Sequence, residues 1–341
     1  MTSGTVLKHY DIDGAQFAPL GRGLINDTYL VTATGGERFV LQRLSAIFPP
    51  EINRDIDVVT RHLGDKGMTT CRIVPATDQR LWVHEDGADW RLLTYIDGQS
   101  HDALENPHQA REAGRLLAQF HAAVSDLDHH FVNPRLGVHD TVRHLQNLRD
   151  ALASQTDHAQ FADVQRIANE ILASAAALPK LPACRDRIVH GDPKINNILF
   201  ARDEDRAICL VDLDTMARMP LSLELGDALR SWCNPAGEDD RQTTFSAELF
   251  APAIEGYAGH AREWIEPNEI ASIVDAALTI LVELAARFCA DALNESYFGW
   301  DSNRFNSRSE HNQVRAAGQI RAAQSLLAQR TELQRVIDRN F

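Results

Sequence analysis

Two stretches of this sequence are the most informative: Ile188-Val189-His190-Gly191-Asp192-Pro193-Lys194-Ile195-Asn196-Asn197 and, twelve residues on, Cys209-Leu210-Val211-Asp212-Leu213-Asp214. An aspartate stands two residues after a histidine, an asparagine follows five residues later, and another aspartate ends a short apolar run. Phosphoryl transfer from ATP uses such groups. One carboxylate accepts the proton of the attacking hydroxyl, while an amide oxygen and another carboxylate hold magnesium.

The spacing of these groups, taken with its surroundings, favours catalysis over an ordinary turn. Clusters of Asp, Asn and Gly between apolar runs are usually turns. Protein kinases, however, use H-R-D-x-x-x-x-N followed by D-F-G, and the offset from aspartate to asparagine is the same here. Residues 198–200 and 207–211 predict two short strands joined by the polar turn 202–205. Asn197 and Asp212 are then expected at the open ends of one hairpin.

Composition limits the classes of partner. The chain has 341 residues and a formal net charge of −14, so its acidic surface disfavours nucleic acid and anionic membranes. Its five cysteines are scattered without a C-x-x-C pair, which is typical of reduced thiols in a cytosol. No secretory leader is recognised at the start, and the longest apolar stretch, near 276–286, is too short to span a bilayer. We therefore expect a cytoplasmic protein that acts on a small molecule, with its oligomeric state open.

The pattern of apolar residues changes near residue 97. Alternation over 27–32 and 38–44, around a Gly-Gly turn, predicts a hairpin, and 82–96 predicts another strand pair. Helical spacing is predicted for 51–63, 107–124, 141–153, 161–177, 247–257, 268–291 and 311–337. We expect an α+β, protein-kinase-like fold of two lobes. Residues 1–96 form a small β-rich, nucleotide-binding lobe, and residues 97–341 form a large, mainly helical lobe for catalysis and substrate binding.

A glycine-rich segment precedes the first predicted hairpin. Gly21 and Gly23 would let backbone N–H groups approach phosphates closely. Asn26 stands where G-x-G-x-x-G has its third glycine, and Asn also tolerates left-handed geometry. Taken alone, the segment is better explained as an ordinary hairpin turn. The kinase-like catalytic loop makes it a candidate phosphate-binding loop.

The strand that carries the phosphate-binding lysine in kinases differs here. Gln42 takes the lysine position of V-A-I-K, and Arg43 follows it. Arg43 is a candidate phosphate ligand, but strand alternation points it to the opposite face, so a solvent-facing role is equally supported. The backbone of Tyr95 and Ile96, at the expected hinge between the lobes, is the candidate contact for adenine.

Two helical segments hold further candidates. Asp227 is a candidate to hold the catalytic loop through backbone N–H groups and also fits a helix N-cap, two roles that are compatible and neither of them catalytic. Glu283 and Arg287 are four residues apart on a very apolar helix. Such a pair is commonly a weak surface salt bridge. The apolar flanks instead favour an Arg287 that faces a cleft.

The catalytic motif resembles the aminoglycoside phosphotransferase superfamily, which also contains choline and homoserine kinases. A narrower resemblance, to N-acetylhexosamine 1-kinases, covers nearly the whole chain. It is carried by Gly23-Leu24-Ile25-Asn26-Asp27-Thr28-Tyr29, Leu41-Gln42-Arg43-Leu44, Asp212-Leu213-Asp214-Thr215, Gly226-Asp227-Ala228-Leu229-Arg230, Arg287-Phe288, Tyr297-Phe298 and His311-Asn312. That family phosphorylates the anomeric hydroxyl of N-acetylglucosamine and N-acetylgalactosamine with ATP and magnesium, and it also has Gln-Arg at the lysine position.

The resemblance implies a role for each motif residue. Asp192 matches the catalytic aspartate, and Arg287 and Tyr297 resemble the sugar-contacting pair, although this chain is one residue shorter between them. Asn197 and Asp212 are the expected magnesium ligands, with Asp214 as a possible helper. The alternatives are a kinase of another small alcohol, such as an amino alcohol, homoserine or an aminoglycoside, and a catalytically silent nucleotide- or sugar-binding module.

Overall fold

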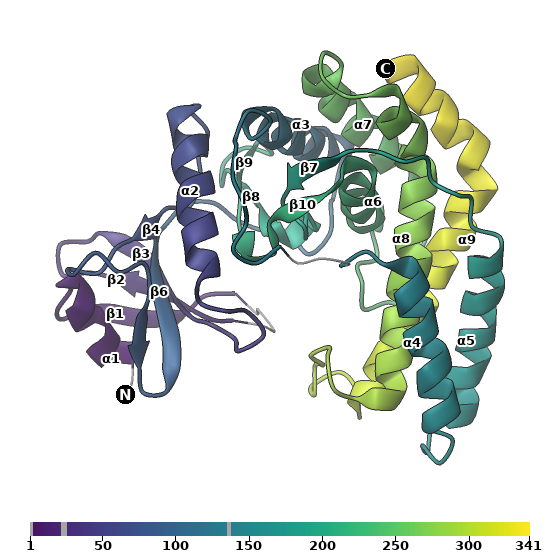
Figure 1. The fold of residues 1–341 in the computed structure, drawn as a ribbon, viewed down its shortest axis with the longest axis horizontal. Helices are drawn as coiled ribbons and strands as arrows, with labels where there is room; N and C mark the ends of the chain where they lie inside the picture. Colours follow the sequence, from purple (N-terminus) through teal and green to yellow (C-terminus); the bar gives the residue numbers. More distant parts are fainter. Residues whose placement is uncertain (1–2, 22–25, 135–137) are drawn as a thin grey trace.

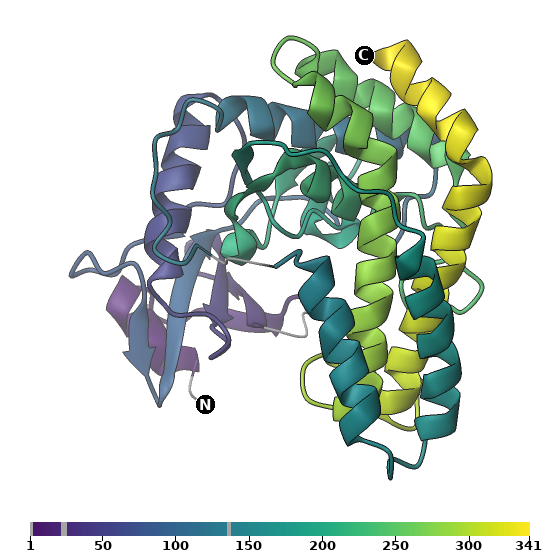
Figure 2. The same ribbon diagram turned by 45° about the vertical axis from the view of Figure 1, so that its right-hand side comes forward.

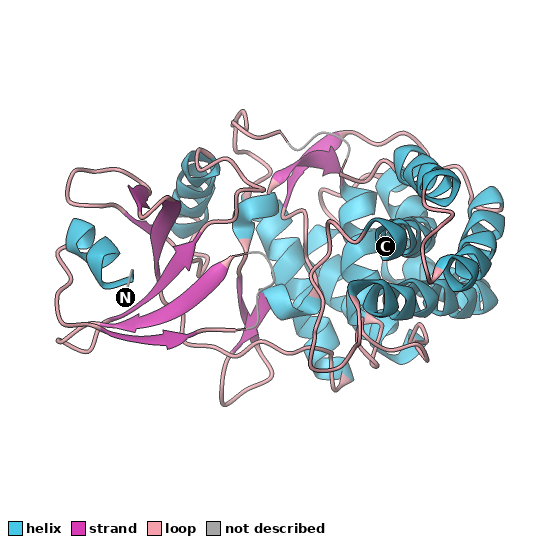
Figure 3. Cartoon of the chain, turned by 90° about the horizontal axis from the view of Figure 1, so that it is seen from below, coloured by secondary structure: helices cyan, strands magenta, loops and turns pink. Residues whose placement is uncertain are grey.

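The computed structural model describes residues 3–21, 26–134 and 138–341, and these form two lobes (Figure 1). The smaller lobe holds an antiparallel sheet, and the larger lobe is built mainly from helices, as the view from below also shows (Figure 3). The expected α+β, protein-kinase-like architecture is therefore confirmed. Across the described parts of the chain, no helix has the length and apolar character needed to cross a lipid bilayer.

The sheet of the N-lobe has the order β1-β2-β3-β6-β4, with β5 paired to β6. Its strands are β1 (Gln16–Pro19), β2 (Asp27–Thr32), β3 (Arg38–Arg43), β4 (Ile73–Val74), β5 (Val83–Glu85) and β6 (Ala88–Thr94). The predicted hairpin is β2–β3, which turns at Gly36 with a positive φ of 91°. Inward-facing Val31, Leu41 and Leu92 are fully buried on one side of this sheet, against α1 (Ser3–Val6) and the 3-10 helix Leu7–Tyr10. This alternation is what the sequence predicted.

Helix α2 (Ile52–Asp65) joins the two lobes. Its apolar residues at positions 52, 56, 59 and 63 are buried, as their spacing predicts for one helix face. They belong to the same continuous core as the residues of the C-lobe. Packing of this helix therefore fixes how the N-lobe sits against the catalytic elements.

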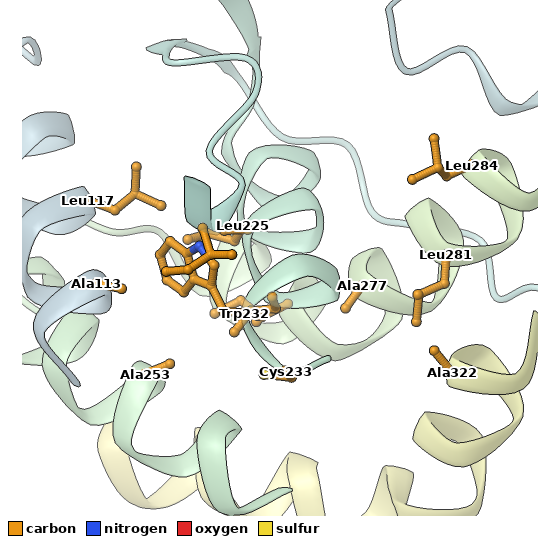
Figure 4. Packing of buried hydrophobic residues seen from close by; sticks show 14 of the residues in the cluster. Ala113, Leu117, Leu225, Trp232, Cys233, Ala253, Ala277, Leu281, Leu284 and Ala322 are labelled. Carbon is orange, nitrogen blue, oxygen red and sulfur yellow. The ribbon is translucent and has the colours of Figure 1, made fainter. Parts of the chain in front are cut away.

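The C-lobe is arranged around the long helix α8 (Figure 2). Its helices are α3 (Pro107–Ala123), α4 (Thr141–Ser154), α5 (Phe161–Ala176), α6 (Leu221–Trp232), α7 (Ala247–Ala261), α8 (Pro267–Asn294) and α9 (Arg308–Asn340). Buried side chains of α3, α7 and α8 lie around α6, whose Trp232 is also buried, and Ala322 of α9 packs beyond α8 (Figure 4). The sequence analysis did not predict α6 as a separate helix. Nor did it predict the strand pair β7 (Asp186–Val189) and β10 (Ala217–Pro220), whose partners are distant in sequence.

Two glycines bring α3 and α7 into close contact. A Cβ atom on Gly114 would lie 2.0 Å from the carbonyl oxygen of Ala253, and one on Gly256 would lie 1.9 Å from that of Arg111. Such distances are well inside van der Waals contact. The helices must move apart if either glycine gains a side chain.

Gly256→Ala is therefore expected to lower the free energy of unfolding by about 1–3 kcal/mol, because overpacking forces the backbones apart. Gly259→Ala is the matched control on the same helix, since nothing lies within 4 Å of its added Cβ. That control should be neutral or stabilising by up to about 1 kcal/mol through helix propensity. Urea unfolding of the two variants checks this, and equal stabilities would contradict the close contact.

Candidate active site

The loop that carries Asp192 is shaped by a glycine. It follows β7 and leads into the 3-10 helix η2 (Ile195–Asn197). Gly191 has a φ of 83°, and a Cβ there would lie 2.1 Å from the carbonyl oxygen of Thr215. Both the positive φ and the close approach require glycine. The buried His190 ring donates from Nε2 to the carbonyl oxygen of Val211 at 2.9 Å, which ties the loop to the end of β9 (Ala207–Leu210).

Glu224 of α6 holds this loop by its backbone. Its two carboxylate oxygens accept hydrogen bonds from the backbone N–H groups of His190 and Gly191, each at 2.9 Å. Burial opposes ionisation of Glu224, but the hydrogen bond and charge of His121, the charge of His190 and the backbone N–H of Gly191 hold its pKa below the ordinary value. The sequence analysis offered this role to Asp227, which instead pairs with Arg230 at 2.8 Å. Glu224, about one helical turn before Asp227, is the acidic residue that holds the loop.

Asp192 lies among polar partners. Its Oδ2 accepts a hydrogen bond from Lys194 Nζ at 2.7 Å and one from Asn197 Nδ2 at 3.3 Å, and Asn197 Nδ2 also bonds to the Asp192 backbone oxygen at 2.9 Å. Burial would raise the pKa of Asp192, but the positive charge of Lys194 outweighs it and holds the pKa below the ordinary value. Lys194 is a site residue that the sequence analysis missed, although it stands only two positions from Asp192.

Asn197 and Asp212 lie at the open end of the predicted hairpin of β8 (Ile198–Phe200) and β9. The backbone N–H of Val211 donates to the Asn197 carbonyl at 2.9 Å, which fixes the two segments side by side. Asp212 adopts a left-handed conformation with φ 64°. Burial and the neighbouring charge of Asp214 raise the pKa of Asp212 to about 6, against the opposing effect of Lys194. A cation bound beside this buried carboxylate would favour its ionised form.

Asp214 has a different environment, in the 3-10 helix η3 (Leu213–Thr215). One carboxylate oxygen pairs with Arg91 at 2.5 Å, and the other accepts a hydrogen bond from Asn26 Nδ2 at 2.7 Å. Asn26 Oδ1 in turn accepts from the backbone N–H of Ser45 at 2.9 Å. Asp214 therefore lies beside Asp212 with both oxygens already bonded to the N-lobe. The Asn26 side chain thus joins the glycine-rich segment to the Asp214 carboxylate.

The remaining nucleotide-binding candidates are spread along the N-lobe. Gly21 has a positive φ of 77° just after β1, while Gly23 lies outside the described residues. Arg43 is half-exposed and pairs with Asp27 at 3.4 Å. It therefore lies on the solvent-facing side of the strand, which is the second of the two roles that the sequence left open for it. Gln42 points the other way and bonds to Arg91 at 2.7 and 2.9 Å.

The linker between the lobes begins at Tyr95 and Ile96. The guanidinium of Arg38 lies 4.3 Å from the centre of the Tyr95 ring, and Arg202 donates to the Tyr95 hydroxyl at 3.3 Å. The backbone groups of Gln99 and Phe200 then exchange two hydrogen bonds at 2.8 and 2.9 Å. These contacts join the linker to the β8–β9 hairpin and hold it along the boundary of the lobes.

Comparison with known proteins identifies the family of this chain. Residues 16–262 match the sequence pattern of the Phosphotransferase enzyme family. The chain belongs to this family. A homoserine kinase of Rhizobium rhizogenes is 25% identical over 174 residues, which are 51% of this chain and 51% of that protein. The chain thus spans about half the length of this curated relative.

Solved structures share the fold of this phosphotransferase family member. A microcompartment-associated aminopropanol kinase superposes with a TM-score of 0.63 at 18% identity, covering 96% of this chain and 97% of the other. An amicoumacin kinase, solved in complex with AMP-PNP, Ca²⁺ and Ami, has a TM-score of 0.63 at 13% identity, covering 93% of this chain and 91% of the other. At these identities the likeness shows the fold, and the expectation of a phosphotransferase family is confirmed by the sequence match.

A cavity of about 570 Å³ lies between α4 and the C-terminal part of α8. Arg287 and Tyr297, the pair that the family resemblance implied as substrate contacts, both line it. The other polar residues of its wall are Arg143, His144, Asn147, Asp150, Ser154, Asp291, Asn294 and Ser296. Arg287 lies over the Phe298 ring at 5.6 Å. The structure therefore brings the two predicted substrate residues to one cavity.

Buried acidic groups shape this cavity. Glu283 bonds to His139 at 2.9 Å and to Thr141 at 2.6 Å, so it ties α8 to the start of α4 rather than pairing with Arg287. Asp291 accepts hydrogen bonds from the backbone N–H groups of residues 296–298 at 2.8–2.9 Å and from Asn312 at 2.9 Å. This carboxylate holds the loop that carries Tyr297. Nothing in the sequence spacing indicated that role.

Proposed function

We propose that this chain is an ATP- and magnesium-dependent small-molecule kinase that phosphorylates an alcohol group. The observation that carries the proposal is that Asn197, which lies beside Asp212 at the end of the β8–β9 hairpin, donates a hydrogen bond to Asp192, so that the three side chains belong to one site. Most of the rate would come from positioning and charge neutralisation, because phosphoryl transfer needs little covalent chemistry from the protein.

In this proposal Asp192 binds the acceptor hydroxyl and takes its proton on a carboxylate oxygen. The ion pair with Lys194 keeps Asp192 ionised and therefore able to accept that proton. Lys194 also places a positive charge beside the reacting groups. It is suited to offset negative charge on the transferred phosphoryl oxygens.

Asn197 and Asp212 fit a magnesium ion. The Asn197 amide nitrogen donates to Asp192, which leaves its carbonyl oxygen as an acceptor, and the Asp212 carboxylate supplies the negative charge. Mg²⁺ is commonly bound by one or two such ligands together with substrate phosphates and water. Within the described residues no cluster of three or more His, Cys, Asp or Glu side chains gathers as an all-protein metal site. When bound, the ion supplies charge neutralisation at the phosphates.

The nucleotide is proposed to lie between the lobes. Gly21 and Asn26 would face its phosphates, and the backbone at Tyr95 and Ile96 would face adenine. The amicoumacin kinase of similar fold was solved with AMP-PNP, which supports a nucleotide site in this architecture. Arg43, half-exposed and paired with Asp27, is the weakest member of the proposed set.

The acceptor is proposed to be an N-acetylhexosamine, phosphorylated at its anomeric hydroxyl. The cavity that contains Arg287 and Tyr297 supports this substrate, because sugars need fixed polar groups and an aromatic wall. Its charges disfavour an ammonium group. Its lining carries Arg143 and Arg287 beside Asp150 and Asp291, and the Asp291 carboxylate already accepts five hydrogen bonds.

A second candidate acceptor is another small alcohol. The curated relative is a homoserine kinase, and one similar fold belongs to an aminopropanol kinase. A screen of sugars, homoserine, amino alcohols and aminoglycosides by ATP consumption separates these classes. Phosphorus NMR of the product then distinguishes a sugar 1-phosphate from a phosphate on any other hydroxyl.

Arg287→Ala is expected to lower kcat/KM for the sugar by about 10–10²-fold, because one hydrogen bond from a charged group is lost. The affinity for ADP should change little, since Arg287 lies in the cavity of the C-lobe. Arg149→Ala is the matched control, because Arg149 is exposed on α4 and does not line the cavity. Turnover only with choline-like or aminoglycoside substrates, unchanged by Arg287→Ala, would overturn the sugar assignment and leave the kinase proposal intact.

A further inference from the structure

Arg91 of β6 is a charged residue in the interior of the protein. Its side chain is 2% exposed and that of its partner Asp214 is 1% exposed. Arg91 Nη1 lies 2.5 Å from Asp214 Oδ1, although the two residues are 123 positions apart. One belongs to the N-lobe sheet and the other to η3 of the C-lobe. The pair is therefore an ion pair between the lobes, shielded from solvent.

The other donors of Arg91 are also used. Nε and Nη2 donate to Gln42 Oε1 at 2.9 and 2.7 Å, and Nη1 donates to Asn53 Oδ1 at 3.3 Å. Gln42 Nε2 donates to the Thr28 hydroxyl at 3.1 Å, which turns its carbonyl oxygen toward Arg91. A planar guanidinium can bond to β3, α2 and η3 at once, whereas a lysine ammonium lacks this fork.

Asp214 is held from a second side by the N-lobe. Its Oδ2 accepts from Asn26, which follows the glycine-rich segment, and Asn26 also accepts from the backbone of Ser45. Asp212 lies two residues before Asp214, in a left-handed conformation at the start of η3. The direction of the Asp212 carboxylate therefore depends on where η3 is anchored.

In protein kinases a lysine of the third strand pairs with a helix carboxylate and with phosphates. Here β3 offers the neutral Gln42 and α2 offers the neutral Asn53. The buried cation comes from β6, and its counter-charge comes from the loop that holds Asp212. We propose that Arg91 and Asp214 form an interlobe latch that positions Asp212 against the N-lobe, with Arg91 acting as a positioning residue rather than a phosphate ligand.

This inference rests on the proposed metal role of Asp212, but its structural part can be tested without metal or acceptor. Buried ion pairs add little net stability, and their best-attested use is to specify one arrangement of the chain. A latch therefore predicts coupled losses when either partner changes. A phosphate-binding Arg91 predicts losses that Asp214 does not share.

The experiment compares Arg91→Met, Asp214→Asn, the double variant and the conservative Arg91→Lys, with Arg61→Met as the control. Arg61 is exposed on α2 and pairs with the nearby Asp57. The measurements are kcat and KM for ATP, the affinity for ADP without metal, and amide hydrogen exchange of residues 213–217 in the metal-free protein.

Each single variant is expected to lower kcat by about 10²-fold, as a small misplacement of a reacting group does, with KM for ATP nearly unchanged. The double variant should lose about the same 10²-fold rather than about 10⁴-fold, because the pair is already broken in each single variant. Exchange at 213–217 should accelerate in both single variants. Arg91→Lys should recover part of kcat, and Arg61→Met should behave like the wild type.

Two results would overturn the latch. One is multiplication of the two losses in the double variant together with unchanged hydrogen exchange. The other is a large loss of metal-free ADP affinity in Arg91→Met that Asp214→Asn does not share. If Arg91→Met does not fold, Asp214→Asn and Arg91→Lys still provide the exchange test. Inactivity of the wild type toward every acceptor would instead count against the proposed function, because the exchange measurement does not need turnover.

Discussion

Asp192→Asn is expected to leave the fold intact and to lower kcat by ~10²–10⁴-fold, the usual contribution of a general base. The amide keeps the shape of the side chain but cannot accept the acceptor's proton. The ion pair with Lys194 is also lost, so the side chain at position 192 is held less firmly. Circular dichroism and steady-state kinetics of the purified variant check the two parts of this expectation.

Asp203→Asn is the matched control for this substitution. Asp203 is exposed in the turn between β8 and β9, so the same chemical change there should leave kcat unchanged. A folded Asp192→Asn protein with near-normal kcat would show that another group accepts the proton, and the catalytic assignment would be wrong.

Asp212→Ala is expected to abolish magnesium-dependent ATP turnover. The remaining Asn197 is neutral and cannot hold the ion against the phosphate charge by itself. A magnesium titration of turnover, together with calorimetry of Mg–ADP binding, measures the loss. An active Asp212→Ala enzyme beside an inactive Asp214→Ala enzyme would mean that the wrong carboxylate of the pair was assigned to the metal.

Although Asp212→Ala is expected to abolish turnover, it is expected to stabilise the metal-free protein. Burial and the charge of Asp214 raise the pKa of Asp212 to about 6, above the value of about 3.9 in an unfolded chain. Ionised Asp212 therefore destabilises the fold above pH 6, and this cost disappears below about pH 4, where the group is protonated in both states. Asp212→Ala should unfold at a higher temperature than the wild type at pH 7 in EDTA, with the difference shrinking as the pH falls.

The sequence predicted the catalytic hairpin because the information is local. The offset from Asp192 to Asn197 and the apolar run before Asp212 are short-range patterns, and two strands joined by a polar turn bring their ends together without help from the rest of the chain. The same holds for the β2–β3 hairpin and for the amphipathic face of α2. Periodicity of 2 or 3.6 residues reports directly which face is buried.

Only the tertiary structure decided which charged groups support those residues. Glu224 binds the backbone of His190 from 34 positions away, and Arg91 meets Asp214 from 123 positions away. An arginine between Trp90 and Leu92 is a detectable signal of a buried cation, but its partner depends on how the two lobes pack. The cavity between α4 and α8 likewise joins segments that have no local relation. Sequence patterns specify elements and their buried faces, whereas the pairing of distant charges follows from the packing of those elements into one core.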